Sequence, residues 1–381
     1  MPQHDVPAVP GILTADEILA TGRSIVSMQE PSGAIPWPEG HTDAWDHVEC
    51  AMALTVCGLN GHARRAYDWL RHTQRDDGSW PKKTVRGTIT DPAAESNQVA
   101  YVAAGVWHEL KITGDEGFAV TMWPAVRRAM EFVLGLQTGR GEIAWERRAD
   151  GTPASYALLT GCSSTYFSLR CAAALADYLG EPQPDWELAA DQLGYVITER
   201  PDVFADKSRF SMDWYYPVLS GVIRGGAARD RIAGRWDDFV VPGLGIRCVS
   251  DQPWVTGAET CELALALDAS GDRDSALAVY ADMQHLRDRD GAYWTGWQFA
   301  NRAHFPNERS SWTAAAVVLA ADALSRTTVG SGLFRAVGAA EGAMDGRDQP
   351  LTGEADPERS STRSEPSTRT SANAPDSSAR R

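Results

Sequence analysis

Carboxylate side chains recur in this sequence where stretches rich in small apolar residues begin. Asp43, Asp46, His47 and Glu49 open one such stretch, "DAWDHVECAMAL". Similar acids open further stretches: Asp91 and Glu95, Glu142 and Glu146, Asp213, Asp251 with Glu259 and Glu262, and Glu308. Two carboxyl groups can supply the acid and the base for cleavage of a glycosidic bond. The same acids could instead cap helices, and "DHVE" fits a capping box with Asp46 as the N-cap.

Aromatic rings accompany these acids in almost every case. Rings can stack on the apolar faces of sugar rings, and carboxylates accept hydrogen bonds from hydroxyl groups. Capping explains a single acid, but it does not explain why rings and acids recur together. We therefore interpret the following residues as the lining of a substrate site: Trp37, Asp43, Trp45, Asp46, His47, Glu95, Trp145, Asp213, Trp214, Trp254, Glu259, Trp294 and Trp297.

The elements that must position these residues are repeated. Gln, Gly and Trp recur in order in "QEPSGAIPW", "QRDDGSW" and "QTGRGEIAW", with the Gln four residues before the Gly each time. A looser fourth copy is "QHLRDRDGAYW". Each copy follows an amphipathic segment and precedes a stretch rich in Ala and Ser. This pattern is typical of repeated helical hairpins.

Six helical hairpins fit the chain when two degenerate pairs are placed between Gly141 and Gly291. Alternating β-branched runs are nearly absent, so we expect few strands. The prediction is an all-α fold, an (α/α)6 toroid that forms a single domain over residues 1–335. Residues 336–381 are rich in Ser, Thr, Pro and Arg and are predicted to be a disordered tail.

Composition excludes several classes of function. The formal net charge is −15, which argues against binding to nucleic acid or to an anionic membrane surface. No basic leader and no apolar run of about 20 residues is visible. Six cysteines without a CxxC pair are expected to be reduced and buried in a cytoplasmic protein. We expect no cofactor and no metal site, and the oligomeric state stays open.

The turn "QRDDGSW" resembles the repeat motif of squalene and hopene cyclases, whose toroid is shared by the protein prenyltransferases. That resemblance covers the four turns and implies the toroid fold. The cyclases protonate their substrate with a DxDD segment, whereas "RWDDF" here has only Asp237 and Asp238. The resemblance therefore implies more about fold than about chemistry.

The segment 100–180 resembles the middle of the glucoamylase-type glycoside hydrolases, which are (α/α)6 barrels. The resemblance implies that Glu146, directly after Trp145, is the general acid. The family's general base lies before its last inner helix, and Glu308 is the nearest match. Asp46 matches an Asp that binds the terminal sugar, although Trp45 stands where that family has Arg. An inverting hydrolysis is implied, with carboxyl groups about 6.5–9.5 Å apart.

Three hypotheses follow for the function. The leading one is a carbohydrate-active enzyme, an inverting glycoside hydrolase with Glu146 and Glu308 in a Trp-rich funnel. The alternative is a terpenoid cyclase or prenyltransferase-like protein, in which the rings would stabilise carbocations. The third is a non-catalytic toroid that binds a glycan or a protein. A polar mouth with several carboxylates would favour the first, and a deep apolar pocket with one acid would favour the second.

Overall fold

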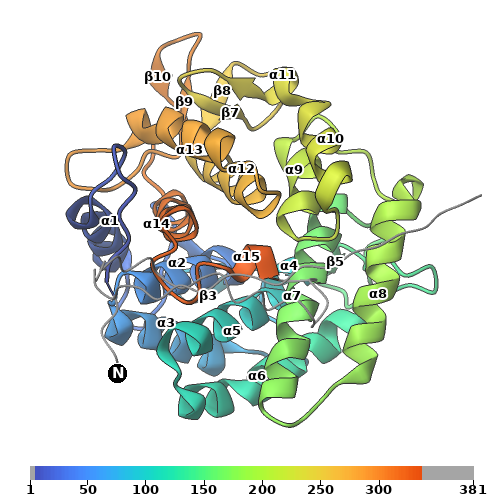
Figure 1. Ribbon diagram of the computed structural model, residues 1–381. Helices are drawn as coiled ribbons and strands as arrows, with labels where there is room; N and C mark the ends of the chain where they lie inside the picture. The colour runs from blue at the N-terminus through green and yellow to red at the C-terminus, as the bar shows by residue number, and fades with distance from the viewer. Residues whose placement is uncertain (1–4, 337–381) are drawn as a thin grey trace, which may run out of the picture. The chain divides into compact units, whose positions relative to one another are not determined.

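The computed structural model describes residues 5–336 of the 381-residue chain, and they form two concentric rings of helices (Figure 1). The inner ring consists of α2 (Ala44–Val56), α4 (Ser96–Ala100) continued by α5 (Val102–Thr113), α7 (Leu159–Tyr178), α9 (Ser211–Leu219), α12 (Gly257–Ala269) and α14 (Ser311–Ser325). The outer ring consists of α1 (Ala15–Met28), α3 (Asn60–Thr73), α6 (Glu116–Leu134), α8 (Pro184–Glu199), α10 (Gly225–Ala233) and α13 (Arg273–Asp282). Helix α14 packs against both α2 and α12, which closes the inner ring. The predicted toroid of six helical hairpins is confirmed.

Residue composition explains which helices lie inside. All residues of α14 from Thr313 to Leu324 are buried, because neighbours surround this Ala-rich helix on every side. The outer helix α3 buries one stripe only, at Ala63, Ala66, Tyr67 and Leu70, which is the spacing of an amphipathic helix. Short helices complete the described residues: α11 (Trp236–Phe239), α15 (Leu333–Ala336) and two 3-10 turns, Pro201–Val203 and Met283–Leu286.

The repeated Gln and Gly residues join neighbouring hairpins. The side-chain amides of Gln29, Gln74 and Gln137 each donate to the carbonyl of the Gly four residues later and to a carbonyl of the next outer helix, over 2.8–3.1 Å. In the fourth copy, Gly291 packs directly against Ala20 of α1. The last turn therefore contacts the first hairpin, and the repeat is explained by the architecture of the ring.

Short strands lie in the connections and form three small sheets, more strand structure than the few strands that the sequence predicts. Strands β1 (His41–Thr42), β2 (Lys83–Val85) and β3 (Thr88–Asp91) form one sheet, and β4 (Ala94–Glu95) pairs with β5 (Glu146–Arg147). A third sheet has the order β10-β9-β8-β7-β6, with β6 (Val240–Val241), β7 (Gly245–Arg247), β8 (Trp254–Thr256), β9 (Gly296–Gln298) and β10 (Ala303–His304). These strands span two to four residues, which is too short for an alternating pattern to be recognised in sequence. Several of them directly precede inner helices, at the end of the ring that we call the mouth.

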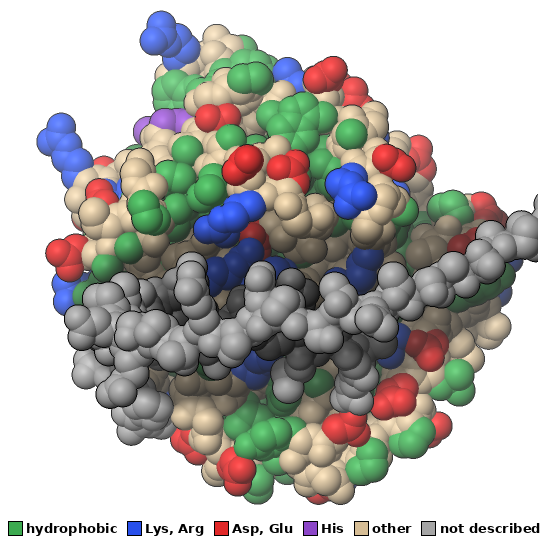
Figure 2. Space-filling model, viewed as in Figure 1, with side chains coloured by type: hydrophobic (Ala, Val, Ile, Leu, Met, Phe, Trp, Pro, Cys, Tyr) green, Lys and Arg blue, Asp and Glu red, His purple; other side chains and the backbone are tan. Residues whose placement is uncertain are grey.

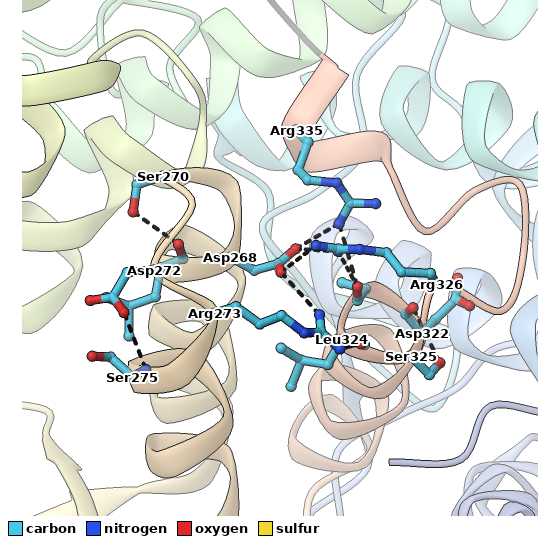
Figure 3. A network of polar contacts seen from close by, with 12 residues as sticks. Asp268, Ser270, Asp272, Arg273, Ser275, Asp322, Leu324, Ser325, Arg326 and Arg335 are labelled. Carbon is cyan, nitrogen blue, oxygen red and sulfur yellow. Dashed lines mark hydrogen bonds and ion pairs between the residues drawn. The ribbon is translucent and has the colours of Figure 1, made fainter. Parts of the chain in front are cut away.

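The opposite end of the ring is closed by α15, which lies near the centre of the view in Figure 1. Phe334 stacks on Phe167 of α7, with ring centroids 5.0 Å apart. The carboxylate of Asp268, near the end of α12, binds Arg335 at 2.6 Å and Arg326 at 2.6 and 2.8 Å (Figure 3). These ion pairs hold α15 against the ends of α12 and α14.

Figure 2 shows that acidic and basic side chains are interspersed on the described part of the face that is seen in Figure 1. The tail predicted from residue 336 onward lies, apart from Ala336, outside the described residues and stays a prediction. All six cysteines are free, and five of them are buried.

Candidate active site

The beginning of α2 carries the first group of carboxyls in the mouth. Asp43 is the N-cap, since its Oδ1 accepts from the backbone N–H of Asp46 at 2.9 Å; the prediction that Asp46 is the N-cap is therefore wrong. Asp46 is instead free to bind side chains. Its Oδ2 accepts from Trp37 Nε1 at 2.6 Å, and its carboxyl group is hydrogen-bonded to that of Asp43. Burial raises the pKa of Asp46 well above its ordinary value, and the charges of Asp43 and Glu49 raise it further.

Glu49 lies one turn further along α2. Its negative charge repels that of Glu262 of α12. Glu49 accepts from Trp45 Nε1 at 2.9 Å, and Glu262 accepts from the Tyr215 hydroxyl. Burial raises the pKa of Glu49 to about 7. Burial, followed by the charge of Glu49, raises the pKa of Glu262 well above its ordinary value. Both carboxyls line a narrow cavity of about 10 Å³ in the middle of the ring, which is space for about one water molecule.

Glu259 is buried at the beginning of α12, one turn before Glu262. It accepts hydrogen bonds from the hydroxyl groups of Thr256 and Ser211, the latter at 3.2 Å, and from the thiol of Cys248. Burial raises the pKa of Glu259. Among the described residues, no Lys or Arg forms an ion pair with Glu259. The side chain is therefore oriented by neutral donors, whose hydrogen bonds favour the carboxylate form that burial opposes.

The pairing of β4 with β5 brings Glu95 directly opposite Glu146. The ammonium group of Lys82 binds both, at 2.6 Å from Glu95 and 3.2 Å from Glu146. Burial raises the pKa of Glu95 to about 7, although Lys82 opposes the shift. Trp145, the neighbour of Glu146, packs its ring directly against Gly161 of α7. This pair of carboxylates is neutralised in part by a cation, whereas Asp46, Glu49, Glu259 and Glu262 form no ion pair with a described Lys or Arg.

Two predicted site residues, His47 and Trp214, have structural roles. His47 is fully buried; its Nδ1 accepts from the Ile35 backbone N–H at 3.1 Å, and its Nε2 lies 2.9 Å from the Ala66 carbonyl. Burial lowers the pKa of His47 to about 4. Trp214 is buried, donates to the carbonyls of α10 and stacks on Phe239. Both residues fix packing between inner and outer elements.

Aromatic residues in and beside the third sheet lie together at another part of the mouth. Trp294 stacks on His304, with ring centroids 4.1 Å apart, and Trp297 meets the same ring edge-on. Trp254 meets the half-exposed Phe305 edge-on at 5.0 Å. Burial, followed by the charge of Glu39, raises the pKa of Glu308 in the same region.

Asp213 of α9 accepts from the Thr160 hydroxyl at 2.6 Å, and burial raises the pKa of Asp213.

Comparison with known proteins shows the family. No protein-family model matches the chain. A curated protein of Mycolicibacterium hassiacum, the "MMP endo-(1,4)-3-O-methyl-alpha-D-mannosidase", is 60% identical over 333 residues, which are 87% of this chain and 92% of the relative. The chain belongs to the family of this mannosidase. It is a glycoside hydrolase, as the acids and rings predicted.

Solved structures with the same fold are more distant. The GH63 mannosylglycerate hydrolase of Thermus thermophilus, in complex with glucose, has a TM-score of 0.64 at 14% identity and covers 79% of this chain and 99% of its own. A D-mannose isomerase has a TM-score of 0.63 at 12% identity and covers 82% of this chain and 96% of its own. At these identities the likeness shows the toroid fold alone. The resemblance to glucoamylase-type hydrolases is thus confirmed at the level of fold, and the 60% identical mannosidase confirms the class of glycoside hydrolase. The resemblance to terpenoid cyclases is not shown.

Sequence reasoning missed three side chains of this glycoside hydrolase's candidate site. Lys82, in "WPKK" after the second Gln–Gly turn, was not recognised as the shared partner of two carboxylates. Glu49 and Glu262 were noted as acids but were not assigned to the site. Each lies three residues after a predicted site acid, Asp46 or Glu259, and a side chain at that spacing shares a helix face with it. That spacing was the available signal.

Neither a metal site nor a membrane span is found in the described part of the chain. Between residues 5 and 336, no group of three or more His, Cys, Asp or Glu side chains is arranged to hold a metal ion. Within the same range, no helix has the length and apolarity needed to cross a membrane. The cytoplasmic location stays a prediction.

The buried Glu49 is expected to make stability depend on pH. Its pKa is raised from an ordinary value of 4.5 to about 7, so ionisation in the folded state costs free energy as pH rises between these values. Glu49→Gln keeps the shape but removes this ionisation. We expect the melting temperature of the variant to exceed that of the wild type at pH 8, with a smaller difference at pH 5. Thermal unfolding across this range measures the effect.

The exposed Glu187 of α8 provides the matched control, since Glu187→Gln removes a carboxylate that is not buried. Its melting temperature should follow that of the wild type at each pH. Identical pH profiles for Glu49→Gln and the wild type would contradict the buried, protonated state of Glu49.

Proposed function

We propose that this glycoside hydrolase cleaves internal α-(1,4) bonds in a polymer of 3-O-methylmannose. The observation that carries the proposal is the 60% identity to an endo-(1,4)-3-O-methyl-alpha-D-mannosidase over 92% of that relative. The carboxyl-rich mouth supports it, because the mouth offers both protonated and hydrogen-bond-accepting groups to a sugar chain.

Asp46 is the proposed general acid. A general acid has to hold a proton near neutral pH, and burial next to Asp43 and Glu49 favours the protonated form of Asp46. Asp46 would give this proton to the glycosidic oxygen as the bond between that oxygen and the anomeric carbon breaks. We prefer it to Glu146, the acid that the glucoamylase resemblance implied, because Glu146 already accepts a hydrogen bond from the ammonium group of Lys82 at 3.2 Å.

Glu259 is the proposed general base. It would take a proton from a water molecule as the water oxygen bonds to the anomeric carbon, so that hydrolysis is balanced by one proton given and one taken. Helix α14 stands between α2 and α12 in the ring, so the two carboxyls project from helices separated by one neighbour. We propose an inverting reaction, which needs room for a water molecule between the two carboxyls. Glu308, the base expected from the sequence, is the second assignment.

Lys82, Glu95 and Glu146 are proposed to bind sugar hydroxyl groups beside the cleaved bond. An ammonium group offers donors and two carboxylates offer acceptors, and the three are already held together. Trp37 and Trp45 are proposed to contact the apolar faces of sugar rings, since both lie next to the carboxyls of α2. Trp254, Trp294 and Trp297 would extend this contact to sugars further along the chain.

The experiment follows purified enzyme acting on an α-(1,4)-linked 3-O-methylmannose oligosaccharide of defined length. Internal cleavage is expected to yield products of intermediate size from the first minutes, before monosaccharide accumulates. Proton NMR of the first products should show the β anomer, because inversion converts an α bond into a β hydroxyl. Release of monosaccharide as the first product would contradict cleavage of internal bonds. A first product with the α configuration would contradict inversion.

A further inference from the structure

A cavity of about 250 Å³ lies between the hairpin β2–β3 and the beginning of α2. We call it the hairpin pocket. Asp43 and Ala44 line it from the beginning of α2, Trp69 from the last turns of α3, and Ile89 from β3. Asp43 is hydrogen-bonded to Asp46, the proposed acid, so the pocket adjoins the proposed position of bond cleavage.

The lining of the hairpin pocket is mainly apolar. Ala44, Trp69, Trp80, Pro81 and Ile89 all contribute to it, and Ile89 is 51% exposed. A side chain of this size would lose contact with water when a ligand entered the pocket, and burial of apolar area is favourable.

Most polar side chains of the pocket already have partners. The Thr73 hydroxyl donates to the Trp69 carbonyl at 2.8 Å, and Arg75 donates to the Pro92 carbonyl at 2.8 Å. Asp43 uses one oxygen as the N-cap. The carboxyl group of Asp43 and the hydroxyl groups of Thr42 and Thr84 are therefore the acceptors that the pocket can offer to a sugar hydroxyl.

We propose that the hairpin pocket binds one mannose ring through its 3-O-methyl ether and thereby selects the methylated polymer. This inference rests on the proposed function. At roughly 30 Å³ per water molecule, the cavity has the volume of about eight waters, which is the scale of one sugar ring. A methyl ether has no donor to satisfy and gains from contact with Trp69 and Ile89. A free hydroxyl packed against Trp69 and Ile89 would lose its hydrogen bonds to water, and these two side chains accept none from it.

The test compares two α-(1,4)-mannose oligosaccharides of equal length, one 3-O-methylated and one not. The wild type is expected to show kcat/KM at least about tenfold higher on the methylated one, since a buried polar group without a partner is costly. Ile89→Asn should lower the ratio of the two kcat/KM values at least about threefold. The change should come from a higher KM for the methylated oligosaccharide with kcat nearly unchanged, because the contact between Ile89 and the methyl group is lost in the ground state and in the transition state alike. Val120→Asn on α6, where Val120 is 60% exposed, is the matched control and should leave the ratio unchanged.

A binding measurement separates this inference from the proposed function. Saturation-transfer NMR with free 3-O-methyl-D-mannose should show transfer to the methyl protons with the wild type, and weaker transfer with Ile89→Asn. The assignment of the hairpin pocket is wrong if the wild type cleaves both oligosaccharides equally. It is also wrong if Ile89→Asn keeps both the wild-type ratio of kcat/KM values and the wild-type saturation transfer. In either case the hydrolase activity stands. If the wild type cleaves neither, the proposed function is wrong.

Discussion

Asp46→Asn is expected to lower kcat on the methylated oligosaccharide by about 10²–10⁴-fold, which is the usual contribution of a general acid. The substitution keeps the size of the side chain, and an amide oxygen can still accept from Trp37 Nε1. It also removes a group whose ionisation is disfavoured by burial and by Asp43 and Glu49. The melting temperature at neutral pH should therefore be equal to or above that of the wild type. A loss of activity would then be due to the missing general acid and not to unfolding of the variant.

The role of Asp46 can be separated from that of Glu259 by changing the leaving group. An aryl glycoside leaves as a phenolate and needs little protonation, so Asp46→Asn should retain much more of the wild-type rate on it than on the oligosaccharide. Glu259→Gln should lose activity on both substrates, because water still has to be activated. The opposite pattern would exchange the two roles.

Glu146→Gln tests the assignment that the sequence suggested. If Glu146 binds substrate together with Lys82 and Glu95, its loss should raise KM more than it lowers kcat. If Glu146→Gln lowers kcat on the oligosaccharide as strongly as we expect for Asp46→Asn, and spares the aryl glycoside, Glu146 is the acid and our assignment of Asp46 is wrong.

The toroid could be predicted because its repeats have a local cause. The spacing of Gln and Gly is fixed by a turn in which one amide binds two carbonyls, as at Gln74, Gly78 and Ala125. The small residues of the inner helices are fixed by burial on all sides. Both constraints act within short stretches and therefore leave a pattern that can be recognised in a single sequence.

The neighbours within the mouth could not be predicted in the same way. Glu49 and Glu262 are more than 200 positions apart in the sequence and become neighbours only because the ring closes through α14. Lys82 joins Glu95 to Glu146 only because β4 pairs with β5 over two residues each, too few to leave a pattern. Trp37 and Trp214 have the same side chain, yet Trp37 binds Asp46 in the mouth and Trp214 packs outward on Phe239. The residue type alone does not determine whether a Trp side chain points into the mouth or toward the outer helices.

Gly78→Ala is expected to be among the most destabilising single-methyl additions in this chain. Gly78 has φ +87°, a conformation that costs an L-residue about 1–2 kcal/mol. In addition, the new Cβ would lie 2.6 Å from the carbonyl carbon of Arg128 in α6, closer than packed atoms approach. Forced overpacking costs typically about 1–3 kcal/mol more. We expect a total loss on the order of 3 kcal/mol in the free energy of unfolding, seen as a lower melting temperature.

Gly58→Ala is the matched control, because Gly58 also has positive φ, +69°, but no atom lies within 4 Å of the added Cβ. It shares the backbone strain and lacks the contact. The difference between the two melting temperatures therefore measures how tightly the Gln74 turn presses against α6. Equal losses would mean that the turn tolerates a wider gap between hairpins, and that the Gly of the repeat is required for its backbone conformation alone.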